Sequence, residues 1–338
     1  MSIAFFFFIA GLIIFIGFFG GIAFERTKIS DILILLCIGI LLGPVLRLIE
    51  PDILTHFAEY FGAFALMIIL FDGGMDLDID RLVREFGFAF ILVCISFGLT
   101  VLFISLFLHY HMGWNTTRSI FMASILGCTS AAIVIPVTGV MSVKAETKTI
   151  LSLESALSDV FAVVLAISIL QSVSLENIGI KEPFRQIASS FSVAIVVGVA
   201  AGFLWMKILD IFRGRKYSYM ITLAAILVLY SLVEFLGGSG FIAILIFGII
   251  LGNCHDFLHI MRMTCTTPLD DTIKFFHGEV TFFIRTFFFV YLGMILSPDF
   301  INPGVLYVSV LLVAIIFIAR YIGVQATGRI TGKKTGDK

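Results

Sequence analysis

The chain has 338 residues, of which 60% are hydrophobic and only 13% are charged, whereas an average soluble domain carries about 25% charged residues. This composition excludes an ordinary soluble protein. The net charge of −1 also argues against a nucleic-acid partner, because binding to a phosphate backbone needs an excess of positive charge.

Long apolar runs separated by charged loops predict an all-α polytopic membrane protein, because a helix of about 20 apolar residues crosses the hydrocarbon core. In chain order, we expect about eleven transmembrane helices: 2–24, 30–46, 56–72, 88–109, 117–140, 148–173, 186–208, 217–235, 239–253, 278–296 and 303–323. The lipid bilayer is therefore the first expected partner of the chain.

The distribution of Lys and Arg predicts the orientation of the chain, since cytosolic loops are enriched in both. The N-terminal side and the loops after the even-numbered spans hold four of the 22 basic residues, whereas the other loops and the tail hold sixteen. The remaining two, Arg285 and Arg320, fall inside spans. We expect a multi-pass cell-membrane protein with the N-terminus outside and a basic C-terminal tail in the cytoplasm.

Two spans carry nearly the same sequence, which indicates an internal repeat. The segment 39–43 (GILLG) matches 248–252 (GIILG), 209 residues later. This offset predicts a first six-helix repeat over 1–173, a linker helix over 174–216 and a second, inverted repeat over 217–338. Inverted repeats are typical of secondary transporters, whose sites lie near the midplane where discontinuous helices meet. The second repeat has room for four helices, so the last two are expected to be missing from the chain.

The fifth span, over 117–140, carries features that interrupt a helix near its middle. Pro136 removes a backbone donor, and a glycine followed by a Thr-Ser pair weakens the helix, so we expect local unwinding near Thr129. Freed carbonyls, with the hydroxyls of Thr129 and Ser130, would face Asp159 and coordinate a hard monovalent cation. The alternative is an ordinary proline kink whose hydroxyls bond back to the preceding turn.

The sixth span, over 148–173, carries a stripe of polar side chains. An ionisable group at the centre of a span costs about 2.5 to 3.5 kcal/mol on insertion scales, so it is a functional candidate by default. Asp159 lies 11 residues after Lys148, which is about 17 Å along a helix and therefore near the midplane. Three more oxygen-bearing side chains share its side of the helix: Glu154, Ser155 and Ser158.

Two other ionisable residues are candidates for supporting roles. Arg285 lies inside the tenth span, where a buried guanidinium needs an anion. We expect it to pair with Glu154, which would leave Asp159 as the one titrating carboxylate. Asp72 ends the third span at its cytosolic side, where it is either a solvated loop carboxylate or an outer ligand in a cation funnel.

Together these features resemble the sodium/proton exchanger family of monovalent cation:proton antiporters, and the resemblance covers nearly the whole chain. It is carried by these segments: 70–75 (LFDGGM), Thr129-Ser130 followed by Pro136, 154–159 (ESALSD), 234–253 and 276–289. The resemblance implies a homodimeric exchanger in which a core domain with a crossed, discontinuous helix moves against a dimerisation domain. Asp159 would match the family's ion-binding aspartate, Thr129 and Ser155 its additional ligands, and Glu154 a structural acid.

The chain departs from the family pattern at three places. Ser158 stands where the family commonly has Asn, and Ser130 stands where it often has Asp, so the choice of ion is open. The missing final helix pair includes, in the family, the second crossing helix and an arginine able to pair with the residue at Glu154.

We therefore expect a proton-coupled antiporter that exchanges Na⁺ or K⁺ for H⁺ at Asp159, electroneutrally and by alternating access. Monovalent cations and protons are its expected substrates, and we expect neither an enzyme nor a cofactor. Two alternatives stay open: a cation channel or solute symporter on the same fold, and a truncated membrane protein that does not transport.

Overall fold

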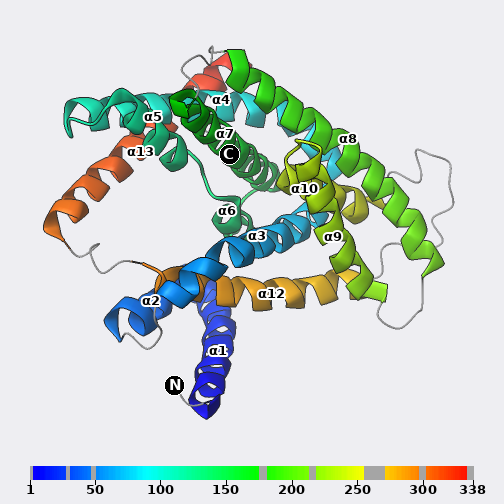
Figure 1. The fold of residues 1–338 in the computed structure, drawn as a ribbon. Helices are drawn as coiled ribbons and strands as arrows, with labels where there is room; N and C mark the ends of the chain where they lie inside the picture. The colour runs from blue at the N-terminus through cyan, green and yellow to red at the C-terminus, as the bar shows by residue number, and fades with distance from the viewer. Residues whose placement is uncertain are drawn as a thin grey trace.

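The computed structural model describes residues 3–27, 31–46, 51–174, 181–212, 218–254, 271–296 and 302–332, and these residues contain helices and no strand. In chain order (Figure 1) the helices are α1 (Ile3–Thr27), α2 (Asp31–Ile40), the π-helix η1 (Leu41–Val45), α3 (Pro51–Met75), α4 (Ile79–Tyr110), α5 (Thr116–Leu126), α6 (Ala131–Val140), α7 (Ala145–Ser174), α8 (Lys181–Ile211), α9 (Ser218–Phe235), α10 (Gly240–Gly252), α12 (Asp271–Met294) and α13 (Pro303–Thr331). The predicted all-α fold class is confirmed.

Six described segments are long and apolar enough to cross a membrane: Ile79–Tyr110, Thr116–Gly139, Ala145–Ala166, Ala188–Leu209, Phe275–Met294 and Pro303–Thr331. Shorter apolar helices cover Phe7–Ile22, Asp31–Val45, Met220–Phe235 and Gly240–Gly252. Each segment overlaps a predicted span, so the multi-pass architecture is confirmed. The predicted domain boundaries stay predictions, and 175–180, 213–217 and the tail after Gly332 lie outside the described residues.

The start of α4 differs from the prediction, which placed the fourth span at 88–109. The helix begins at Ile79, because the side chain of Asp78 accepts a hydrogen bond from the backbone N–H of Arg81 at 2.9 Å and caps the first turn. Most of the charged residues between the third and fourth predicted spans therefore belong to the first turns of α4, which are partly exposed.

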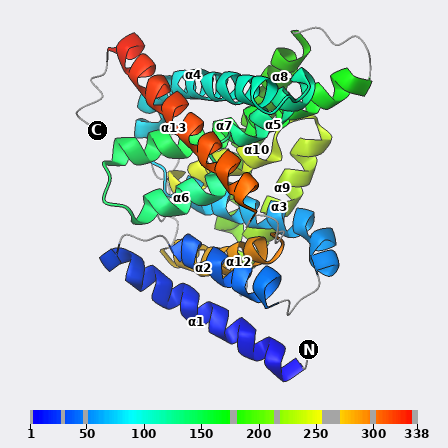
Figure 2. The same cartoon turned by 90° about the vertical axis from the view of Figure 1, so that its left-hand side faces the viewer.

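The helices form two groups that meet around α6 and α7. Figure 2 shows α1, α2 and α12 at one end of the molecule and α4 and α13 at the other. The helix α3 packs against α10, α12 and α6, whereas α4 packs against α13, α7 and α5. The helix α7 also contacts α6 and α8, so it joins the two groups.

Glycines allow close backbone contacts in several described helix pairs, and two of these pairs are the tightest. In the pair of α3 and α10, a Cβ added at Gly248 would overlap the carbonyl oxygen of Phe71. In the pair of α2 and α12, a Cβ added at Gly293 would overlap the carbonyl oxygen of Leu36. Small residues that let backbones approach are a common basis of helix packing in membranes.

The variant Gly248→Ala is expected to lower the free energy of unfolding by about 2 kcal/mol, because the added methyl group forces α3 and α10 apart. Gly98→Ala in α4 is the matched control, since a Cβ there meets nothing within 4 Å. Thermal unfolding in detergent measures both variants. Equal melting temperatures would contradict the close packing of the two helices.

Candidate functional site

The fifth predicted span is broken into two helices, as expected. The helix α5 ends at Leu126, α6 begins at Ala131, and residues 127–130 between them are not helical. Pro136 lies inside α6. The unwinding near Thr129 is confirmed. Gly127 N–H and Ser130 C=O still take part in the flanking helical turns. Thr129 N–H, by contrast, bonds to Ser158 Oγ of α7 instead of to a carbonyl of its own helix.

The helix α7 carries the polar stripe toward this break. Glu154, Ser155 and Ser158 are buried, and Asp159 is partly buried. Because α7 packs against α5 and α6, its stripe faces the interrupted segment. The structure therefore brings the two sequence features together into one polar site inside an apolar bundle.

Thr129 is the main link between the broken helix and α7. Its backbone N–H donates to Ser158 Oγ at 3.1 Å, and its hydroxyl donates to Glu154 Oε1 at 3.2 Å. The Thr129 and Ser158 hydroxyl oxygens also lie 3.1 Å apart. Two of the predicted ligand hydroxyls, those of Thr129 and Ser158, and the predicted structural acid Glu154 are therefore in direct contact.

Asp159 receives one hydrogen bond on each carboxylate oxygen. The backbone N–H of Ala131 donates to Oδ2 at 3.2 Å, and the thiol of Cys128 donates to Oδ1 at 3.0 Å. Ala131 is the first residue of α6, so the carboxylate lies at a helix N-terminus, where the helix dipole favours negative charge. Among the described residues, no Lys or Arg forms an ion pair with Asp159.

The two other predicted serines make no contact with the carboxylate. The Ser155 hydroxyl donates to the carbonyl of Ser152 at 3.0 Å, within its own helix. Ser130 precedes α6 without a hydrogen bond from its side chain to the helix. Both lie next in sequence to residues that do make contacts, so they remain predicted ligands.

The predicted pairing of Arg285 with Glu154 is wrong. Arg320 of α13 binds Glu154 through two hydrogen bonds, from Nη1 to Oε1 at 3.0 Å and from Nη2 to Oε2 at 2.5 Å. Arg285 instead pairs with Asp31 at 2.9 Å, between α12 and α2. The error has a physical reason: any arginine inside a span needs an anion, and this requirement does not say which helix supplies it.

Asp72 lies within α3 and is partly buried, rather than in a loop. Its carboxyl lies near the side chain of Thr281 in α12 and in the field of Asp76 and Lys148. These last two form an ion pair at 3.9 Å in which the Asp76 side chain is 60% exposed. Asp72 is therefore not a loop carboxylate, and its role as an outer cation ligand stays a prediction.

Three residues of this network were not among the predicted site residues. Arg320 was noted as a basic residue inside a span, and that signal was enough to make it a second candidate partner for Glu154. Asp31 lies at the start of the second predicted span, and Cys128 lies inside the fifth. A thiol one residue before Thr129 was the only available sign of a role for Cys128.

Comparisons with known proteins find similar transmembrane proteins. A family described as "Sodium/hydrogen exchanger, transmembrane" matches residues 11–338. The probable Na⁺/H⁺ antiporter 2 of Methanocaldococcus jannaschii is 25% identical over 319 residues, which cover 89% of this chain and 71% of that protein. The K⁺/H⁺ antiporter NhaP2 of Shewanella oneidensis is 26% identical over 234 residues, which cover 68% of this chain and 40% of that protein.

A solved structure has the same fold. The sodium proton antiporter MjNhaP1 from Methanocaldococcus jannaschii, at pH 8, matches with a TM-score of 0.77 and 25% identity. The match covers 99% of this chain and 81% of that chain. The structural similarity therefore includes the helices that carry the polar site.

Proposed function

The chain belongs to the sodium/hydrogen exchanger family of transmembrane proteins, and from this we propose that it exchanges Na⁺ or K⁺ for H⁺ across a cell membrane. Similar proteins are named as Na⁺/H⁺ antiporters in one species and as K⁺/H⁺ antiporters in another, so both cations are candidate substrates. The family is one of transporters, which agrees with the expected absence of an enzymatic reaction.

One observation carries the proposal: the site holds two carboxylates but one guanidinium. Arg320 neutralises Glu154 through a bidentate pair. Within the described part of the chain, the hydrogen-bond partners of Asp159 are a thiol and a backbone amide. An unpaired negative charge in a membrane is costly, so Asp159 is the group that a proton or a cation neutralises.

The oxygen atoms around Asp159 fit a hard monovalent cation. The hydroxyls of Thr129 and Ser158 lie in contact with each other, and the non-helical residues 127–130 add backbone carbonyls. Ser130 lies at the start of α6. The Ser155 hydroxyl now donates to the carbonyl of Ser152. We propose that it turns away from this carbonyl to become a ligand of the cation.

We propose that the site opens to the two sides of the membrane in turn. An occupied, neutral site lets the core move, whereas the empty anion is held back by the cost of burying its charge. The two close helix pairs support an inverted repeat, since the contact of α2 with α12 and that of α3 with α10 are the two that the predicted repeat relates to each other. Inverted repeats of this kind support alternating access.

The orientation of the chain in the membrane and its oligomeric state are also proposed. The bias of Lys and Arg places the N-terminus outside and the C-terminus in the cytoplasm. Asp72 and the Asp76–Lys148 pair then lie toward the cytosolic side, where cations approach the site. By resemblance to the family, the chain forms a homodimer.

The exchange is expected to be electroneutral, because one carboxylate carries either one proton or one monovalent cation. The test uses purified protein in liposomes that contain a pH-sensitive dye, with an outward proton gradient. Adding Na⁺ or K⁺ outside is expected to dissipate the gradient, and clamping the membrane potential with a membrane-permeant anion such as thiocyanate is expected to leave the rate unchanged.

Two results of this assay would contradict the proposal. Uptake of radioactive Na⁺ without any dye response would indicate a channel or a symporter. If liposomes that hold correctly folded protein show neither a dye response nor cation uptake, the chain is a membrane protein that does not transport.

A further inference from the structure

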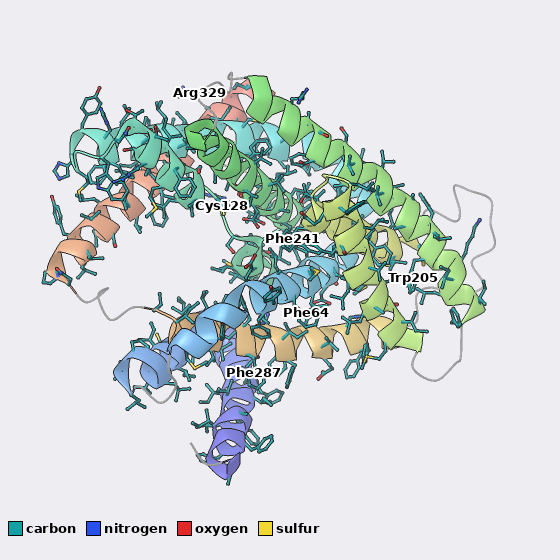
Figure 3. All side chains as sticks on the ribbon, in the orientation of Figure 1. Phe64, Cys128, Trp205, Phe241, Phe287 and Arg329 are labelled. Atoms are coloured by element: carbon teal, nitrogen blue, oxygen red, sulfur yellow. The ribbon has the colours of Figure 1, made fainter. Side chains whose placement is uncertain are left out.

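The thiol of Cys128 lies inside the polar site, in the non-helical segment between α5 and α6. Figure 3 labels Cys128 where the end of α5 approaches α7. The cysteine is partly buried; of the other described cysteines, Cys37 and Cys94 are exposed and Cys254 is buried beyond the end of α10. Cys128 is the cysteine that bonds to the site, through the carboxylate of Asp159.

Cys128 has a defined partner, since its sulfur lies 3.0 Å from Asp159 Oδ1. An ionised carboxylate only accepts hydrogen bonds, so the thiol is the donor. Oδ2 takes its one hydrogen bond from the backbone of Ala131 at 3.2 Å. Each oxygen of the proposed ion-binding carboxylate is therefore covered by a single donor.

The two donors differ in how easily they can move away from the Asp159 carboxylate. The N–H of Ala131 is fixed by the start of α6. The thiol of Cys128 stands on a single rotatable Cα–Cβ bond in the non-helical segment 127–130, and a thiol is a weak donor. An ionised carboxylate offers about two lone-pair directions on each oxygen, and the thiol takes one of those on Oδ1. A cation that approaches Oδ1 from that direction competes with the S–H donor.

We propose that the Cys128 thiol is a positioning residue that donates to Oδ1 of Asp159 and competes with the cation for this oxygen, turning away when a cation binds. It thereby sets the apparent affinity of the site for the cation. This inference rests on the proposed function, because it concerns the same carboxylate. It adds a sulfur group to a site that is otherwise built from oxygen atoms.

The first test is the cation dependence of exchange in Cys128→Ala. The variant loses the competing donor, so KM for Na⁺ at alkaline pH is expected to fall about five-fold, the size of one ordinary hydrogen bond, with a smaller change in kcat. Cys128→Ser keeps a donor and is expected to return KM to within about two-fold of the wild type. Cys94→Ala, at an exposed cysteine of α4, is the control and should leave KM unchanged.

The second test needs no variant that could fail to fold. Infrared difference spectra of the wild type, with and without Na⁺, report the S–H stretching band. The proposal predicts a shift of this band when Na⁺ binds, and no such shift in Cys128→Ala. An unchanged S–H band in wild-type protein that binds Na⁺, or an unchanged KM in Cys128→Ala, overturns it. Wild-type protein without any exchange would contradict the proposed function instead.

Discussion

Asp159→Asn is expected to abolish cation-dependent proton movement in liposomes, with a loss of about 100-fold or more. Asparagine keeps the shape of the side chain but can neither take up a proton in this pH range nor balance the charge of a cation. A loss of 100-fold corresponds to about 2.7 kcal/mol, which lies within the range of a hydrogen bond to a charged group. The response of an internal pH dye to added Na⁺ is the measurement.

The same substitution at an exposed carboxylate provides the control. Asp80→Asn changes a residue in the first turn of α4 that is exposed, so it should exchange at the wild-type rate. Elution of both variants as a single peak in detergent shows that each is folded. Exchange at more than a tenth of the wild-type rate in Asp159→Asn would rule out Asp159 as the ion-binding carboxylate.

Arg320→Met is expected to cause the largest loss of stability of any single change in the site, about 3 to 5 kcal/mol. The substitution leaves Glu154 without its bidentate partner, and the Glu154 side chain is only 3% exposed. Arg329→Met, at an exposed position of the same helix, should change stability by less than about 0.5 kcal/mol. Thermal unfolding in detergent compares the two variants.

A second substitution separates the ion pair from other effects of losing Arg320. In Glu154→Gln/Arg320→Met the unpaired charge is gone, so most of the lost stability is expected to return. The amide oxygen of Gln can still accept the hydrogen bond that Thr129 donates to Glu154. If Arg320→Met is no less stable than Arg329→Met, the assignment of the pair is wrong.

The parts of the fold that depend on local chemistry could be predicted from the sequence. The apolar runs located the helices because crossing a membrane needs a fixed length of apolar helix. Pro136, with the glycine and hydroxyl residues before it, located the break between α5 and α6 because these residues weaken a helix locally. The stripe around Asp159 followed from helical spacing alone.

The contacts between distant helices could not be predicted in the same way. Arg285 and Arg320 both lie in apolar runs, and the sequence contains nothing that distinguishes which one reaches Glu154. The answer depends on packing, since α13 lies against α4 and α12 lies against α2. Cys128 was missed for a similar reason: a cysteine in an apolar run is typical of a core residue, and only the fold brings it to Asp159.

The central claim is that protons and cations compete for one carboxylate, and the dependence of KM on pH tests it most directly. Exchange rates in liposomes are measured over a range of Na⁺ concentrations at several pH values. Competition at Asp159 predicts that KM for Na⁺ rises by about tenfold for each unit by which the pH falls, once the pH is low enough for protons to occupy most of the cation-free sites. The maximal rate is expected to stay constant. A KM that stays constant while the maximal rate falls would place the proton and the cation at separate sites and contradict the account.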